Sequence, residues 1–137
     1  MAKRRALSLL LCLLLLLCTA CGGQAQEDEG ALHCTVTIEC STVLEHMDDL
    51  KPGKADIVPP DGVLLTETTV AFSEGDTVFD VLQRVCRAQG IHMESTWTPA
   101  YNSAYIEGIG NLYEFDCGEL SGWMYSVNGV WPDYGWS

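Results

Sequence analysis

The sequence predicts an α+β domain in which one main helix packs on a small mixed or antiparallel sheet. A strand-like alternation over 33–41 comes first, and a single amphipathic helix follows over 77–89. After residue 91 the pattern returns to short strand-like segments separated by turn residues. No long repeat or low-complexity segment interrupts this order, so the sequence predicts one small domain with a modest core.

The first twenty residues have the features of an export signal. Three cations at positions 3–5 precede an apolar run over 6–17, which is shorter than the roughly 20 residues of a membrane-spanning helix. The segment then ends at 18–21 with Cys-Thr-Ala-Cys, which resembles a bacterial lipobox. We therefore predict a lipoprotein signal peptide over 1–20.

Cys21 is the predicted site of lipid attachment, and residues 21–32 are the predicted flexible tether. This arrangement predicts an exported protein anchored by lipid on the outer face of the bacterial cytoplasmic membrane. Cys18 stands where a lipobox usually has leucine, so ordinary secretion with cleavage nearby is the alternative.

Charge excludes two classes of partner. Residues 21–137 keep only four cations but all 19 acids, a net charge of -15. Nucleic-acid binding needs clustered lysine and arginine, and so does attachment to anionic lipid through a basic patch. We therefore expect no nucleic-acid partner.

Four cysteines, Cys34, Cys40, Cys86 and Cys117, follow the signal and tether and are disulfide candidates in an oxidising compartment. Cys34 and Cys40 flank one strand-like run about 20 Å long, whereas a disulfide needs Cα atoms roughly 6 Å apart. The spacing therefore disfavours that pairing, and disulfides or free thiols remain open for the four cysteines. No Cys-x-x-Cys or histidine pair has zinc-ligand spacing, so no metal site is expected.

The elements are predicted in order from local pattern. Residues 33–41 alternate with period two and predict a half-buried strand. Residues 42–67 contain several proline and glycine breakers and are predicted to be irregular, with a short helical turn within 43–50. A second strand is expected over 68–72, and a turn over 73–76.

The helix has clear boundaries. Thr77 is positioned to cap it, with Asp80 three residues later, and Gly90 is positioned to end it. The apolar positions repeat at helical spacing and include Cys86. We therefore interpret Cys86 as a core residue or a buried disulfide partner rather than a catalytic thiol.

Four further strands are expected over 91–98, 104–109, 112–115 and 122–127. Asn128-Gly129 then predicts a two-residue hairpin turn. Ten of the twelve aromatic residues lie within 97–137, interleaved with asparagine, glycine and serine. Tyrosine and tryptophan provide flat contact area with a polar group, as in ligand- and protein-binding surfaces. Packing within a small β-domain is the alternative use of these side chains.

Three motifs in this part of the chain carry a family resemblance: Glu-Gly-Asp-Thr-Val-Phe-Asp-Val-Leu at 74–82, Tyr-Ile-Glu-Gly-Ile at 105–109 and Gly-Trp-Met-Tyr-Ser-Val-Asn-Gly at 122–129. In order and spacing they resemble the transcobalamin-like C-terminal domain, a domain of unknown function common in exported bacterial lipoproteins. The resemblance covers about 34–136. It implies a β-grasp-like fold related to domains that bind small ligands, with a corrinoid such as cobalamin as the implied ligand.

The chain also differs from that family. Relatives continue beyond the segment that matches Tyr134-Gly135, so we expect the domain over 33–137 to lack its final strands and to be a truncated copy. The animal carriers enclose cobalamin with a separate helical domain, which has no counterpart here. One-sided binding is therefore expected to be weak unless another protein completes the site.

The sequence favours a binding module over an enzyme. His33, His46 and His92 are scattered, with no nucleophile–base spacing and no cofactor motif. The first hypothesis is a membrane-anchored small-ligand module. The alternative is a cell-envelope protein-interaction or adhesion module without a small ligand. The residues predicted to contact the ligand are Trp123, Tyr125, Asn128 and Trp131.

Overall fold

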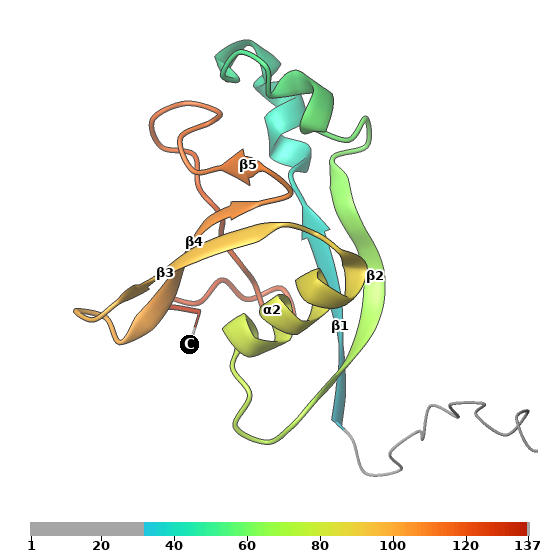
Figure 1. Cartoon of the computed structure of the whole chain (residues 1–137), viewed down its shortest axis with the longest axis vertical. Helices are drawn as coiled ribbons and strands as arrows, with labels where there is room; N and C mark the ends of the chain where they lie inside the picture. The colour runs from blue at the N-terminus through green and yellow to red at the C-terminus, as the bar shows by residue number, and fades with distance from the viewer. Residues whose placement is uncertain (1–31, 137) are drawn as a thin grey trace, which may run out of the picture. The chain divides into compact units, whose positions relative to one another are not determined.

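Two long antiparallel strands form the first sheet. β1 (Leu32–Glu39) pairs with β2 (Val63–Phe72). The register is irregular at the end of β1, where it shifts on either side of Ile38. The computed structural model describes residues 32–136, so the predicted signal peptide, Cys21 and nearly all of the tether lie outside the described residues (Figure 1).

The second sheet is a three-stranded antiparallel meander. β3 (Met93–Thr98) pairs with β4 (Ser103–Ile109), which in turn pairs with the two-residue β5 (Leu112–Tyr113). Figure 1 shows the β3–β4 hairpin extending away from the first sheet. The predicted α+β class is confirmed, and the strands divide between two antiparallel sheets.

Helix α2 (Val78–Gln89) has the boundaries that its capping residues predict. The Thr77 hydroxyl accepts a hydrogen bond from the backbone N–H of Asp80 at 3.2 Å, and the Asp80 carboxylate accepts one from the N–H of Thr77 at 2.9 Å. These bonds complete a capping box. The Thr77 hydroxyl also donates to the Asp80 carboxylate at 2.7 Å, and this bond and the bond from the Thr77 N–H lower the pKa of Asp80 from its ordinary value, because both favour the ionised carboxylate. The helix ends at Gly90, which has a left-handed φ of 67°.

Replacing Thr77 with alanine is expected to lower the free energy of unfolding by about 1 kcal/mol, because the first turn of α2 loses its cap. Thr77→Ser keeps the hydroxyl and is expected to retain most of that stability. Urea denaturation of both variants checks the prediction. Equal losses in the two would show that the hydroxyl is not the stabilising group.

The main core lies where α2 meets both sheets. Its most buried side chains come from β1, β2, α2 and β4, and each is at most 8% exposed. They are Ile38, Leu65, Val70, Leu82, Val85, Cys86, Ile106 and Ile109. The helix therefore joins the two sheets through one apolar cluster.

Three short 3-10 helices cover a second cluster at the ends of β1 and β2 (Figure 1). They span Ser41–Glu45, Met47–Asp49 and Ala55–Ile57. Val43, Val58 and Leu112 are buried beneath them with Cys40. The first two lie where the sequence predicts a short helical turn. Among residues 32–136, no helix is long and apolar enough to cross a membrane.

Three strand predictions need correction. Residues 63–67 belong to β2 rather than to the irregular segment, because they pair with the end of β1 across its register shifts. β5 stops at Tyr113 instead of continuing to Phe115, since Phe115 has a left-handed φ of 62° and turns the chain away. Residues 122–126 form no strand, although their side chains alternate between partly buried and exposed. The turn at Asn128-Gly129 is confirmed by two hydrogen bonds between Val127 and Val130.

All four cysteines of the described region are thiols, so none of the candidate disulfides is present there. Cys34 packs against the main core that contains Cys86, whereas Cys117 packs against the second cluster that contains Cys40. Cys34 and Cys40 thus belong to different clusters. Burial raises the pKa of the Cys86 thiol to about 11, which keeps it protonated and unreactive at neutral pH.

Candidate functional site

A hollow lined by aromatic side chains lies between the β3–β4 hairpin and the C-terminal segment 122–136. Its volume is about 480 Å³. Six of its lining residues are aromatic: Tyr101, Tyr105, Trp123, Tyr125, Tyr134 and Trp136. Tyr101 is 82% exposed and Tyr134 is 71% exposed, so the hollow is open to solvent on the side that these rings border.

The hollow forms because the C-terminal segment passes very close to β4. A Cβ atom built on Gly135 would lie 2.1 Å from the Ser103 hydroxyl oxygen, so a larger residue would push the segment away. The segment is also tied to α2, since the backbone N–H of Phe79 donates to the carbonyl of Trp136 at 2.8 Å. The close approach of Gly135 to Ser103 and the hydrogen bond from Phe79 to Trp136 therefore position the end of the C-terminal segment, which forms one side of the hollow.

Trp123 fixes the start of the C-terminal segment. Its indole Nε1 donates to the carbonyl of Leu112 at 2.9 Å, and its ring packs against both apolar clusters. Only part of the ring is exposed, and that part faces the hollow. Trp123 is therefore a structural residue as well as a lining residue.

Tyr125 and Trp136 form the most ordered part of the lining. Their ring centroids are 4.5 Å apart with an interplanar angle of 39°. The Tyr125 hydroxyl donates to the carbonyl of Gly135 at 2.8 Å. Burial and the neighbouring Tyr134 raise the pKa of Tyr125, so its hydroxyl stays neutral. This pair offers a preformed aromatic surface to a ligand.

Two carboxylates lie at the aromatic lining, one bonded to Tyr105 and one among the lining residues. The Tyr105 hydroxyl donates to the carboxylate of Glu114, and this bond, burial and the charges of Glu114 and Glu107 raise the pKa of Tyr105. Asp133 is the one acidic side chain among the residues that line the hollow. The lining thus supplies ring faces, hydroxyl groups and one negative charge.

The structure brings together two of the four predicted contact residues. Trp123 and Tyr125 line the hollow, but Asn128 and Trp131 do not. Asn128 has a φ of 51° and serves the hairpin turn, while Trp131 is 64% exposed next to it. The residues missed were Tyr101, Tyr105, Tyr134 and Trp136. All four belong to the aromatic-rich region 97–137, but the sequence alone does not show which of its rings lie close together in the fold.

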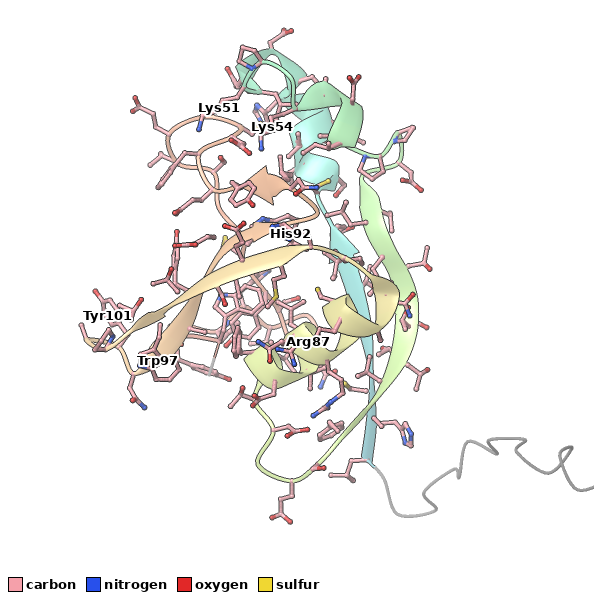
Figure 2. All side chains as sticks on the ribbon, viewed as in Figure 1. Lys51, Lys54, Arg87, His92, Trp97 and Tyr101 are labelled. Carbon is pink, nitrogen blue, oxygen red and sulfur yellow. The ribbon has the colours of Figure 1, made fainter. Side chains whose placement is uncertain are left out.

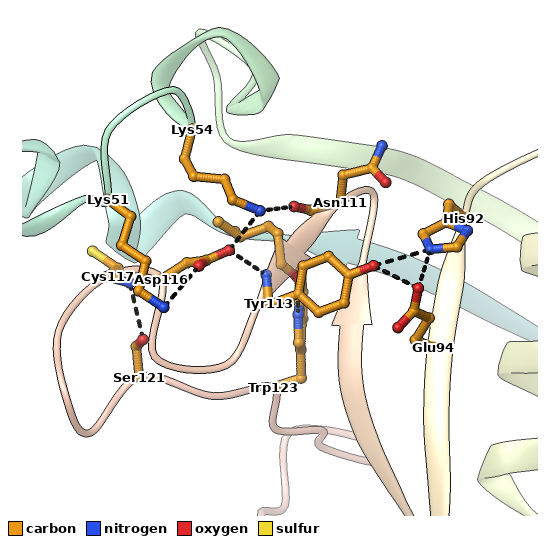
Figure 3. Close-up of polar contacts among 11 residues, drawn as sticks. Lys51, Lys54, His92, Glu94, Asn111, Tyr113, Asp116, Cys117, Ser121 and Trp123 are labelled. Carbon is orange, nitrogen blue, oxygen red and sulfur yellow. Dashed lines mark hydrogen bonds and ion pairs between the residues drawn. The ribbon is translucent and has the colours of Figure 1, made fainter.

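A second polar cluster connects β3 with β5 (Figure 3). Nε2 of His92 lies 3.0 Å from the Glu94 carboxylate and 3.1 Å from the Tyr113 hydroxyl, which itself donates to Glu94 at 2.7 Å. The bonds from Tyr113 and His92 lower the pKa of Glu94, and the bond to Glu94 raises the pKa of Tyr113. These groups are exposed and their hydrogen bonds are made within the cluster, so we interpret them as a brace between strands.

Asp116 is the most buried carboxylate of this region, with a side chain that is 5% exposed. It accepts hydrogen bonds from Lys54 at 2.9 Å and from the backbone N–H of Tyr113 at 2.8 Å, and Lys51 lies 3.4 Å away (Figure 3). Burial raises its pKa, but the bonds from Lys54, Tyr113 and Lys51 outweigh burial and leave the pKa below 3.8. Asp116 therefore fastens the 3-10 helix region to the turn after β5.

The described residues contain no cluster of three or more histidine, cysteine or acidic side chains that could hold a metal ion. The hollow offers stacking and hydrogen bonding but no adjacent nucleophile–base pair among its lining residues.

Comparison with known proteins gives one match. No curated protein and no solved structure matches the chain. Residues 75–137 match the family model of DUF4430, a domain of unknown function. That span includes α2, the second sheet and every residue that lines the hollow, so the matched region contains the complete candidate site.

Proposed function

We propose that the protein is an extracytoplasmic binding module that holds a small ligand in the aromatic hollow. The proposal depends on one observation: six aromatic side chains from three separate stretches of the chain converge on a single hollow. A lipid on Cys21 would tether the module to the outer face of the membrane. We propose no catalytic role.

The size and chemistry of the hollow support this function. A volume of about 480 Å³ falls within the roughly 300–1,000 Å³ range of small-molecule sites. Aromatic faces bind flat or apolar surfaces, and the tyrosine hydroxyl groups add polar contacts. Because the exposed rings leave one side open, a ligand keeps part of its surface in water. Affinity from this face alone should therefore be modest unless a second protein covers the ligand.

We further propose a corrinoid as the first ligand to test. The resemblance to the transcobalamin-like C-terminal domain supports this choice, because that family includes cobalamin carriers. Three residues of the third motif, Trp123, Met124 and Tyr125, also line the hollow.

Tyr134→Ala is expected to weaken binding of cobalamin or cobinamide at least about fivefold, since a stacked aromatic ring contributes about 1 kcal/mol or more. Tyr134 is 71% exposed, so its loss should leave the fold intact. Trp131→Ala is the matched control: it removes a similarly exposed ring outside the hollow and should leave affinity unchanged.

Equilibrium dialysis with the purified protein measures these affinities, and near-ultraviolet circular dichroism confirms that each variant is folded. Equal weakening by both substitutions would contradict a site in the hollow. Absence of corrinoid binding by the folded protein would remove the corrinoid as ligand.

The second candidate function is protein interaction on the cell envelope. Four apolar side chains within residues 120–131 are exposed: Leu120 at 100%, Met124 at 71%, Val130 at 67% and Trp131 at 64%. Exposed apolar side chains of this size favour a surface that meets another protein. Leu120→Asp should abolish cross-linking to an envelope partner on intact cells while leaving small-ligand binding unchanged.

A further inference from the structure

We infer that the hollow selects its ligand by charge and takes an organic cation, such as an alkylated ammonium group, in preference to a neutral or anionic compound of the same shape. This inference rests on the proposed function of the hollow as a small-ligand site. It names a chemical class of ligand for the same hollow as an alternative to the corrinoid, and three features of the described residues lead to it.

The first feature is the composition of the lining. Of the residues that line the hollow, six are aromatic and none is lysine, arginine or histidine. The face of an aromatic ring carries negative potential and attracts a cation placed over it. Alkylated ammonium groups are bound in this way by several rings at once, because they are large, weakly hydrated cations.

The second feature is the position of the acids. Asp133 lines the hollow and is exposed, so its carboxylate can face a cation there. Behind the lining, the Tyr105 hydroxyl donates to Glu114, and the Thr96 hydroxyl donates to Glu107, which lies close enough to Tyr105 to raise its pKa. Asp133 is therefore the acidic residue of the lining, with Glu114 and Glu107 behind it next to Tyr105, and a negative charge at each position favours a cation over an anion.

The third feature is where the positive side chains lie. Lys51 and Lys54 contact Asp116 in the region of the 3-10 helices, far from Tyr101 (Figure 2). Arg84 is bound to Asp76 at 2.8 Å. Arg87 lines a different, smaller hollow beside α2. No arginine or lysine of the described residues is thus placed to neutralise an anionic ligand in the aromatic hollow.

The experiment compares three probes of one shape: choline, its neutral isostere with a tert-butyl group in place of trimethylammonium, and the anion tert-butylacetate. Quenching of tryptophan fluorescence in the full-length protein measures their affinities, because Trp123 and Trp136 line the hollow. We expect choline to bind at least about fivefold more tightly than the neutral isostere. Binding of the anion should be undetectable.

Substitutions then identify the side chains that give the hollow its preference for choline. Asp133→Asn should weaken choline about twofold to fivefold and leave the neutral isostere unchanged, as expected for an exposed charge pair. Tyr134→Ala should weaken both, whereas Trp131→Ala, an exposed aromatic substitution outside the hollow, should change neither. Raising the salt concentration should reduce the affinity for choline alone.

Each other outcome overturns the inference. Equal affinities for choline and the neutral isostere would show that shape rather than charge selects the ligand, and the proposed function would stand. Preference for the anion would contradict the inferred role of the carboxylates. Failure of all three probes to bind the folded protein would reject the organic cation, while corrinoid binding in the dialysis would still support the proposed function.

Discussion

Trp123→Ala is expected to cause the largest loss of stability of any single substitution at the hollow, about 3 kcal/mol, near the lower end of values for buried tryptophan. The ring contacts both apolar clusters, so its removal opens a cavity where they meet. The carbonyl of Leu112 also loses its hydrogen bond from the indole. Small domains are stable by only about 5–15 kcal/mol, so this change removes a large fraction of the total.

Trp123→Phe separates the contribution of ring packing from that of the indole hydrogen bond. It keeps an aromatic ring in the core but removes the indole N–H, so a loss of about 1 kcal/mol is expected. Urea denaturation followed by circular dichroism measures both variants. Trp131→Ala should change stability by less than about 0.5 kcal/mol, because its side chain is 64% exposed. A loss from Trp131→Ala as large as that from Trp123→Ala would contradict the assignment of Trp123 as the anchor.

Asp116→Asn is expected to lower the free energy of unfolding at neutral pH by about 2 kcal/mol, the typical value for hydrogen bonds to a charged group. Asp116 is almost fully buried and contacts Lys54, Lys51 and the backbone of Tyr113. Glu119→Gln is the matched control, because it neutralises an exposed acid in the same turn. The control should change stability by less than about 0.5 kcal/mol.

The effect of Asp116→Asn should depend on pH. The folded state holds the pKa of Asp116 below its ordinary value of 3.8. The stabilisation is therefore complete above that value and is lost as pH falls through the lower, folded pKa. Urea denaturation from pH 7 down to acid should show the difference between wild type and Asp116→Asn shrinking below about pH 3.8. A difference that stays constant across this range would contradict a role for the ionised carboxylate.

The sequence was sufficient for elements whose signals are local. The Thr77–Asp80 capping box, Gly90 and the apolar stripe between them determine α2 within a few residues. Asn128-Gly129 likewise determines its turn. The alternation over 33–41 predicted β1, because one face of that strand meets the core along its length.

Elements that depend on distant partners were harder to predict. Val63–Glu67 lacks strict alternation, since the register with β1 shifts where these residues pair, and Gly62 directly precedes them. Residues 122–126 alternate like a strand because Trp123 and Tyr125 face inward, yet no neighbouring strand pairs with their backbone. The alternation in residues 122–126 therefore predicted which side chains are buried, but it could not predict whether their backbone has hydrogen-bond partners.

The candidate site shows the same division. The concentration of aromatic residues after position 97 indicated the correct part of the chain, and Trp123 and Tyr125 were identified within it. Tyr101 and Tyr134 are 33 residues apart and border one hollow only because the chain folds back, with Gly135 close to Ser103. The contacts of Asp116 with Lys51 and Lys54 were missed for the same reason, because they join distant parts of the chain.

The central claim is that ligands bind in the aromatic hollow, and the protein's four tryptophans test it directly. Trp123 and Trp136 line the hollow, whereas Trp97 and Trp131 lie outside it. Each indole N–H gives its own resonance in a proton–nitrogen correlation spectrum, which can be recorded during titration with cobinamide and with choline. We predict that the signals of Trp123 and Trp136 move saturably with at least one probe while the other two stay fixed. Movement confined to Trp97 or Trp131, or no movement with either probe, would contradict the claim.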